Sequence, residues 1–469
     1  MADTGIKEEE TNIIEEVAVE EGATIKEASV AGTFYPANAV DLINQIEMFK
    51  NSSKNFYKNT SRAVIVPHAG LIFSGQLAYD AINLLDKGIK NLFIFAPAHK
   101  VAFEGLAVSS FDKWETPLGK ISLNREIIFE LREKFGVKIN DDAIAPEHSL
   151  EVEVPIIQFI HDDIKIIPIL IGANVRPENI RSIIETYYPN TENGFVISSD
   201  LSHELADDKA TKLDHVTAEM IETGNIQNFQ YEMACGAIGI AGLIEFANKS
   251  GFNMIRIGMT NSSAVNGDKV KVVGYGSWFL YEGDRNNFIG KYHADFVVAL
   301  VKTVIKSAFD KSQMTINYPQ VFDEIGACFV TLEKDGALRG CIGSILPNQP
   351  LINDIVQHAK DAAFKDPRFA PLRADEFGNI KVSVSLMSTP SRIQFKNEED
   401  LLNQIVPYQD GIIIKDGNLQ SVYLPSVWNE IPNKQEFLTS LKVKAGMQAN
   451  YFSPTFEAYR FSTIHIKEA

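Results

Sequence analysis

The stretch AVIVPHAG at residues 63–70 joins a short β-rich apolar run to a histidine and a glycine turn. Residues 75–85 then have helical spacing, and the next apolar run, 92–96, leads to His99. Two further runs, 164–171 and 195–199, have the length and composition of buried strands. Strands separated by helical stretches predict an α/β domain, with a mostly parallel sheet and helices on both faces.

Histidines follow three of the four strand candidates within four residues of the carboxyl end, at His68, His99 and His203. In open α/β sheets, ligands bind beyond the carboxyl ends of the strands. The spacing therefore predicts a functional site at that edge of the sheet.

Cys235 joins His68 and His99 as a candidate metal ligand. It precedes Gly236 and a predicted helix at residues 237–248, and a cysteine at a helix N-terminus has a lowered pKa. Two imidazoles and one thiolate leave open positions for water or substrate, as in catalytic zinc and iron sites. The alternative is that the histidines are hydrogen-bonded loop residues and that Cys235 is buried packing.

Other polar residues near the strand ends are candidates for catalysis or substrate binding. Asp200 stands three residues before His203 and could orient it as a general acid or base. The alternative is a helix-capping aspartate and a surface histidine. His148 and Glu151 are also three apart and could position a substrate or support a metal ligand. Tyr35, in GTFYP, could line the same cleft, although packing explains it better.

The charge of the chain is uneven. The 469 residues carry a net charge of −17, and residues 1–25 hold eight acids and one base, which gives −7 and leaves −10 elsewhere. Residues 1–25 are predicted to be a disordered acidic tail. The remaining acidic excess argues against a nucleic-acid surface. Strand-sized apolar runs predict no membrane span, and three cysteines without a secretory signal predict a cytoplasmic protein.

A polar stretch at residues 283–287 is the predicted domain boundary. Beyond it the pattern changes to helices and β-rich segments with frequent Gly and Asn turns. The expected helices are 293–307 and 351–364, and the expected strands are 327–331, 380–386, 412–415 and 421–424. This order is typical of an α+β domain with an antiparallel sheet. The predicted division is a tail at 1–25 and domains at 26–284 and 288–469.

The motifs of the first domain resemble those of the Memo family, in the family's order. They are GTFYP (32–36), PHAG (67–70), FSG (73–75), PAH (97–99), EHSLE (147–151), SSDLSH (198–203), CG (235–236) and VGY (273–275). The resemblance implies a fold like that of the class III extradiol dioxygenases, which use non-heme iron. It also implies metal ligands at His68, His99 and Cys235, and a catalytic histidine at His203. The expected ion is iron(II), with copper(I) or zinc as alternatives.

The chain departs from the Memo pattern at two places. Glu153 stands where many Memo sequences have a second histidine, and Leu71 and Ile72 replace the usual aromatic after PHAG. Both departures are expected to affect substrate contacts more than metal binding.

The second domain resembles the AMMECR family through LRGCIG (338–343), DPRF (366–369), VSVSL (382–386), YLP (423–425) and LKVKAG (441–446). Gly340 and Gly343 would let another backbone or a ligand approach the strand. Arg339 and Cys341 could form a reactive or anion-binding spot, with Arg368 as a second cationic fork. The alternative is that Cys341 is a buried strand residue.

In prokaryotes, Memo and AMMECR proteins commonly accompany a radical-SAM protein, in the AmmeMemoRadiSam system. The expected function is therefore a metal-dependent, dioxygenase-like oxidoreductase that works with a radical-SAM partner. Its cleft is expected to bind a small molecule or a peptide. Two alternatives remain: a non-catalytic iron- or copper-binding protein, and an interaction scaffold that uses the old active-site cleft.

Overall fold

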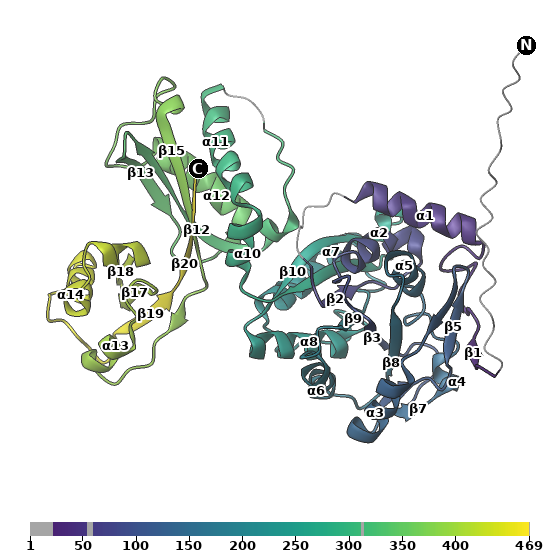
Figure 1. Cartoon of the computed structure of the whole chain (residues 1–469). Coiled ribbons are helices and arrows are strands. Elements are labelled where there is room, and N and C mark those ends of the chain that lie inside the picture. Colours follow the sequence, from purple (N-terminus) through teal and green to yellow (C-terminus); the bar gives the residue numbers. More distant parts are fainter. Residues whose placement is uncertain (1–21, 54–59, 311–313, 469) are drawn as a thin grey trace, which may run out of the picture.

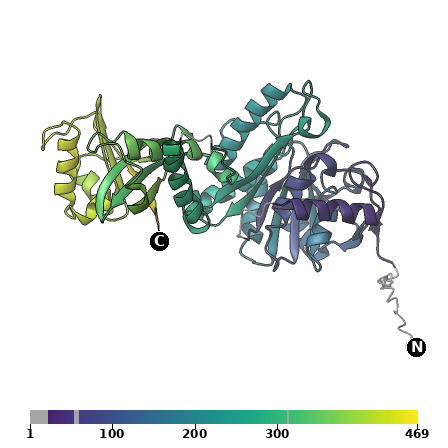
Figure 2. The same ribbon diagram turned by 90° about the horizontal axis from the view of Figure 1, so that it is seen from above.

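The computed structural model describes residues 22–53, 60–310 and 314–468. An α/β domain and an α+β domain lie next to each other along an elongated molecule (Figures 1 and 2). Most of the predicted acidic tail lies outside the described residues. Its last residues are ordered, contrary to the prediction, because the Thr24 N–H donates to Asp112 and strand β1 (Ile25–Lys26) pairs with β5 (Lys113–Thr116).

The first domain is built on an eight-stranded sheet with the order β10-β11-β2-β9-β3-β8-β4-β7. The strands are β10 (Asn253–Asn261), β11 (Gly274–Tyr281), β2 (Ala63–Val66), β9 (Asn193–Ser198), β3 (Asn91–Pro97), β8 (Lys165–Ile171), β4 (Leu106–Val108) and β7 (Lys138–Ile139). The four predicted strands form the central parallel block β2-β9-β3-β8, whereas β10, β11 and β4 pair antiparallel with their inner neighbours. The prediction of a mostly parallel sheet is confirmed.

Helices cover both faces of this sheet, which is why the central strands are mostly apolar. Figure 1 shows α1 (Ala39–Ser52), α2 (Leu71–Ile82) and α5 (Val154–Ile160) on one side, and α3 (Arg125–Phe135), α6 (Pro177–Tyr187) and α8 (Ala237–Ser250) on the other. Helix α2 begins four residues earlier than expected, directly after Gly70. The remaining elements are α4 (Asp141–Ile144), β6 (Gly119–Ser122), α7 (Asp207–Thr223) and α9 (Ser263–Asn266).

The second domain is α+β, as its sequence predicts, but it has two antiparallel sheets where one was expected. The first contains β13 (Ala337–Gly343), β12 (Ile325–Lys334), β15 (Ile380–Met387) and β20 (Thr463–Lys467), with β14 (Gln349–Pro350) beside β12. The second contains β16 (Ser391–Arg392), β19 (Glu457–Phe461), β17 (Gly411–Asp416) and β18 (Leu419–Tyr423). The helices are α11 (Ala294–Asp310), α12 (Leu351–Phe364), α13 (Glu398–Gln404) and α14 (Lys434–Lys444), with 3-10 turns η1 (Gln320–Asp323), η2 (Phe377–Asn379) and η3 (Pro425–Asn429).

The polar stretch at 283–287 is a structured connection. Asp284 caps helix α10 (Arg285–Tyr292) by accepting the Asn287 N–H, and Asn286 is buried. Arg285 donates to the Ile325 carbonyl and to Glu324 of the second domain. These polar side chains are therefore engaged in bonds at the junction of the two domains.

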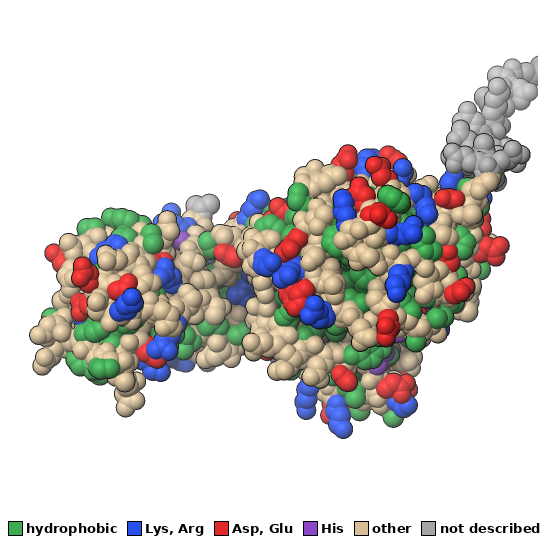
Figure 3. Space-filling view, turned by 90° about the horizontal axis from the view of Figure 1, so that it is seen from below, with side chains coloured by type: hydrophobic (Ala, Val, Ile, Leu, Met, Phe, Trp, Pro, Cys, Tyr) green, Lys and Arg blue, Asp and Glu red, His purple; other side chains and the backbone are tan. Residues whose placement is uncertain are grey.

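Two surface properties bear on the function classes. Acidic and basic side chains are interspersed over the face in Figure 3, with no single-sign field of the kind that nucleic acid requires. Within the described part of the chain, no helix is both long enough and apolar enough to cross a membrane.

Candidate metal centre

The strand order brings three loops to one point at the carboxyl edge of the sheet. Strand β9 lies between β2 and β3. His68, Asp200 and His99 each follow the last residue of one of these three strands by two positions. Their loops are therefore adjacent, although the residues are up to 132 positions apart.

Three imidazoles converge there, those of His68, His99 and His148. One ligand atom from each lies within 4.8 Å of those of the others, a spacing that could hold a metal ion. The ring centroids are 5.2 Å apart for His68 and His99, 5.4 Å for His68 and His148, and 4.9 Å for His99 and His148. His148 was predicted to contact substrate or to support a ligand, and the structure places its ring in the cluster itself.

The Nδ1 atoms of all three rings face oxygen atoms of the protein. His68 Nδ1 lies 2.7 Å from Ser198 Oγ, His99 Nδ1 lies 3.2 Å from Glu147 Oε1, and His148 Nδ1 lies 3.0 Å from the same oxygen. A hydrogen bond at Nδ1, as in His68 and His99, leaves Nε2 available, which is the usual arrangement of histidines that bind a metal. The contact of His148 Nδ1 is close but poorly aligned. The outer partners are thus in place around a possible ion.

Glu147 is the residue of this candidate site that sequence reasoning missed. Its carboxylate is buried and also accepts the backbone N–H groups of His99 and Lys100. Burial raises its pKa, but hydrogen bonds from His148 and His99 outweigh burial and hold the pKa well below its usual range. The only sequence signal was its position beside His148 in EHSLE.

Cys235 lies against His68 at the start of helix α8. Its Sγ is 3.3 Å from His68 Nε2. Two ligands of one zinc-like ion, at about 2.3 Å for sulfur and about 2.0 Å for nitrogen, lie roughly 3.5 Å apart at a tetrahedral angle. The donor set therefore fits an ion shared by the two residues.

The predicted lowering of the Cys235 pKa is wrong for the metal-free protein. Burial, and next the nearby Asp200 carboxyl, raise the pKa of the thiol well above its usual range. The side chain is 5% exposed, so desolvation of the thiolate exceeds the effect of the helix N-terminus. A cation bound at Sγ would remove the thiol proton.

Asp200 and His203 do not form the predicted pair. The Asp200 carboxyl accepts the His68 N–H at 2.9 Å, and burial raises its pKa to about 7. Among the described residues, no hydrogen bond joins it to His203. The His203 side chain is exposed and bonds to the Leu201 carbonyl; partial desolvation lowers its pKa, and His99 lowers it further. Asp200 thus positions the His68 loop, and His203 stands apart from it.

The structure corrects the predicted substrate contacts of Glu151 and Tyr35. The buried Glu151 carboxylate accepts from the Lys26 ammonium at 2.5 Å, from the Ser29 and Val30 N–H groups at 3.0 Å, and from the Tyr35 hydroxyl at 2.6 Å. A buried carboxylate needs such partners, so both residues fasten the N-terminal segment to the domain.

The two departures from the Memo pattern also lie elsewhere than expected. Glu153 is fully buried, and its Oε1 is 2.8 Å from Ser198 Oγ, behind His68. Leu71 is buried in the core and Ile72 is exposed to solvent. Glu153 therefore faces the outer partners of the cluster and not a substrate.

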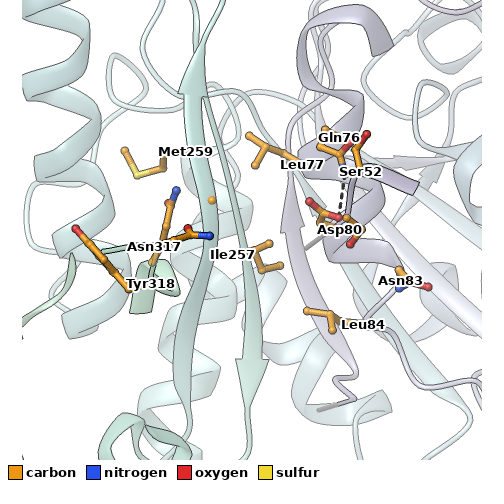
Figure 4. Close-up of a pocket in the computed structure, with 13 residues that line it drawn as sticks. Ser52, Gln76, Leu77, Asp80, Asn83, Leu84, Ile257, Met259, Asn317 and Tyr318 are labelled. Atoms are coloured by element: carbon orange, nitrogen blue, oxygen red, sulfur yellow. Dashed lines mark hydrogen bonds between the residues drawn. The ribbon is translucent and has the colours of Figure 1, made fainter. Parts of the chain in front are cut away.

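A pocket of about 270 Å³ opens beside Cys235. Most of its lining is apolar, and the Tyr231 side chain stands at its surface. The lining residues include Pro97, Ala98, Phe103, Ile171, Ile238 and Tyr231. A second pocket of similar volume, at the domain junction, is lined by Leu77, Asp80 and Tyr318 among others and lies away from the histidines (Figure 4).

In the second domain, the predicted arginine forks are paired within the domain. Arg339 contacts Glu376 at 3.0 Å, and Arg368 contacts Asp366 at 2.7 Å and donates to the Cys341 carbonyl. Cys341 is half-buried on β13, and its N–H also donates to Asp366. Both arginines are therefore paired with acids of their own domain.

The glycines of this motif allow close approach of the chain to itself. A Cβ on Gly340 would lie 2.1 Å from the Ala362 carbonyl of α12, and one on Gly343 would lie 2.4 Å from the Cys328 carbonyl. The neighbouring backbone, and no ligand, occupies the space that a side chain would fill.

Comparisons with known proteins agree with this architecture. The Memo-like protein family model matches residues 26–279, and the AMMECR1 model matches residues 298–466. A MEMO1 family protein of Archaeoglobus fulgidus is 31% identical over 257 residues, 52% of this chain and 95% of the relative. A protein of Methanocaldococcus jannaschii is 36% identical over 178 residues, 37% of this chain and 89% of the relative.

The crystal structure of an uncharacterized protein from Pyrococcus horikoshii aligns at 29% identity, over 37% of this chain and 89% of that one, with a TM-score of 0.35. The family matches cover the two domains described above, one after the other. The chain therefore belongs to the Memo family and carries an AMMECR1 domain behind its Memo domain.

Proposed function

We propose that the Memo domain binds one metal ion at His68, His99 and Cys235 and uses it in an oxidoreductase reaction of the dioxygenase type. The observation that carries the proposal is the convergence of three imidazoles with outward Nδ1 partners beside a buried thiol. His148 is the fourth side chain beside these three residues. The metal content of His148→Ala decides whether it is also a ligand. Iron(II) is the proposed ion, since imidazole suits iron; copper(I) and zinc are the alternatives.

The ion and the residues around it would have different roles in this reaction. The ion would supply Lewis-acid and redox chemistry. The apolar pocket beside Cys235 would hold a small organic substrate and exclude water from it. His203 has a lowered pKa and is therefore neutral at pH 7, so it can accept a proton as a general base.

Metal analysis of protein purified without oxygen tests the site. We expect about one ion per chain, and severe loss of the ion in His68→Ala, His99→Ala and Cys235→Ala. His215→Gln, an exposed histidine on α7, is the matched control and should keep the ion. Full occupancy in Cys235→Ala would remove Cys235 from the ligand set, and loss of the ion in His148→Ala would add His148.

Oxygen uptake with catechol-like compounds tests the reaction. Turnover by the iron-loaded protein that falls strongly in His203→Gln, with metal content unchanged, supports an oxidoreductase. A loaded protein without oxygen uptake supports the second candidate, a non-catalytic iron- or copper-binding protein. A chain that binds no metal but captures a peptide in the pocket supports a scaffold.

A radical-SAM protein is the proposed partner of the chain, on the basis of the family resemblance. The fusion gives both domains a high local concentration for one shared partner or intermediate. Because Arg339 and Arg368 are paired internally, their replacement is expected to lower the melting temperature. If the folded variants instead co-purify less well with the radical-SAM protein, Arg339 and Arg368 would be part of the surface that binds this partner.

A further inference from the structure

We infer that the pocket at the domain junction binds a small organic cation, an amine with an apolar body, through the carboxylate of Asp80. This pocket has a volume of about 270 Å³ and lies away from the three histidines, so its ligand is distinct from that of the proposed ion site. In Figure 4, Asp80 lies on one side of the pocket, and Asn317 and Tyr318 lie on the other.

Both domains contribute to the lining of this pocket. From the first domain, helix α2 supplies Asp80 and Leu77, and strand β10 supplies Ile257 and Met259. The segment of the second domain that precedes η1 supplies Asn317 and Tyr318. A ligand in this pocket would therefore contact both domains at once.

Asp80 is the only charged residue in the lining, so the pocket is negatively charged. Its carboxylate accepts a hydrogen bond from the Gln76 amide at 3.1 Å, and Ser53 is a second hydrogen-bond partner. Within the described ranges, no Lys, Arg or His pairs with this carboxylate. Burial raises the pKa of Asp80, and a cation beside it would offset that cost of burying the charge. A cationic ligand therefore complements this pocket, whereas an anionic one would be repelled.

The other side chains and the volume define the body of the ligand. Leu77, Leu84, Ile257 and Met259 give the pocket an apolar surface that suits carbon atoms. A cavity of about 150 Å³ can hold benzene. A volume of about 270 Å³ therefore has room for one ring with a short aminoalkyl chain.

An organic ammonium group fits this pocket better than a metal ion does. A hard cation such as Mg²⁺ or Ca²⁺ needs several oxygen ligands around one point, and Asp80 supplies the only carboxylate. In the described part of the chain, the histidine cluster is the one group of side chains with the spacing to hold an ion. An ammonium group needs one carboxylate and neutral acceptors, and the Asn83 amide and the Tyr318 hydroxyl lie in the same lining.

Benzylamine, benzyl alcohol and benzoate test this preference, because they share a ring and differ in charge. Their affinities for the full chain are measured by titration calorimetry at pH 7. Benzylamine should bind at least about tenfold more tightly than benzyl alcohol, since a hydrogen bond between charged groups is stronger than one to a neutral group. Benzoate should show no saturable binding.

Three variants place the binding in this pocket. Asp80→Asn removes the charge and keeps the size, so benzylamine should bind it about as weakly as benzyl alcohol. Asp162→Asn removes an exposed carboxylate outside the pocket and is the matched control, which should keep the preference. Met259→Trp narrows the pocket without a change of charge and should weaken the binding of benzylamine and benzyl alcohol alike.

Hydrogen exchange on the full chain shows where the ligand lies. Bound benzylamine should slow the exchange of backbone N–H groups in α2 and β10 and also in residues 314–320 of the second domain. Protection of one domain only, equal affinity for benzylamine and benzyl alcohol, or an unchanged affinity in Asp80→Asn overturns the inference. If Asp80→Asn does not fold, the three compounds and the exchange pattern of the wild type still decide. Metal content plays no part in these measurements, so they stand whether or not the histidine cluster binds an ion.

Discussion

Single carboxylates in the first domain have roles that their residue type alone does not reveal. Glu147, Glu151 and Glu153 lie within seven positions and are all buried. The first faces two imidazoles, the second fastens the N-terminal segment and the third contacts Ser198 behind His68. Their hydrogen-bond partners, and not their exposure, separate these roles.

Glu147→Gln should weaken metal binding about 10–100-fold, because it removes the charged partner of His99 and His148. Glu151→Gln is the matched control. It should lower the free energy of unfolding by roughly 3–5 kcal/mol, since it breaks the buried pair with Lys26, and leave metal affinity unchanged in the folded fraction. Metal titration and denaturant unfolding of both variants measure this contrast. Equal losses of affinity would contradict the assignment.

The cysteines should differ in reactivity. In the metal-free protein at pH 7, Cys341 should be alkylated first, because it is only half-buried. Cys235 and Cys328 should react slowly, since burial raises the pKa of both thiols and little thiolate is present. Pulse alkylation followed by mass spectrometry gives the order. Labelling of Cys235 as fast as Cys341 would show that its thiol is more open or more acidic than the structure implies.

At the scale of elements, close approach of backbones determines where the functional segments lie. Helix α8 begins after Gly236, whose N–H donates to Ser199 Oγ and whose missing side chain leaves room for the end of β9. Helix α12 crosses β13 in the same way at Gly340. The contact at Gly236 positions Cys235 at the proposed ion site, whereas the contact at Gly340 lies in the other domain.

Gly236→Ala and Gly340→Ala should therefore have different effects. A Cβ at position 236 would lie 2.6 Å from the Ser199 Cβ, so α8 and Cys235 must move. Overpacking of this kind costs about 1–3 kcal/mol. Both variants should be less stable in denaturant, but only Gly236→Ala should lose metal affinity. An unchanged affinity in Gly236→Ala would separate Cys235 from the ion site.

At the scale of the whole molecule, charged side chains connect the two domains. Arg285 of α10, at the boundary, contacts Glu324 of the second domain at 3.2 Å. Glu324 also feels the charges of Glu222 and Arg256, which pair with each other inside the first domain at 2.5 Å. Arg256, Glu222 and Glu324 are almost fully buried. The two domains are therefore joined by side-chain contacts as well as by the connecting segment. These contacts at the predicted boundary, residues 283–287, argue against independent folding of the two domains.

Arg285→Ala should loosen the junction. We expect a loss of roughly 3 kcal/mol in the free energy of unfolding, because Glu324 loses its partner. Limited proteolysis with mass spectrometry should find residues 283–287 resistant in the wild type and cleaved in the variant. Rapid cleavage of the wild type there, giving two fragments that each unfold cooperatively, would instead support independent domains.

The loss in the free energy of unfolding of Arg285→Ala should depend on pH. Burial, and next the charge of Glu222, raise the pKa of Glu324 to about 8, above its usual 4.5. Between these values the folded chain holds a proton that the unfolded chain has released, so this group's contribution to stability falls as pH rises through the window. Arg285 matters most once Glu324 is ionised. The effect of Arg285→Ala should therefore be larger at pH 9 than at pH 6 in denaturant titrations.

The sequence by itself determined the central strands and the family, because both depend on local pattern. Apolar runs of four to eight residues between helical stretches predicted the central strands β2, β9, β3 and β8. The ordered motifs predicted the two domains. The strand prediction holds because parallel strands buried on two faces are mostly apolar.

Only the tertiary structure decided which polar residues meet. The insertion of β9 between β2 and β3 brings the Asp200 carboxyl to the backbone N–H of His68. The turn before α5 carries His148 to the cluster, and burial, which no local pattern measures, raises the pKa of the Cys235 thiol. Strand order and desolvation depend on contacts between distant parts of the chain, so spacing along the sequence does not encode them in readable form.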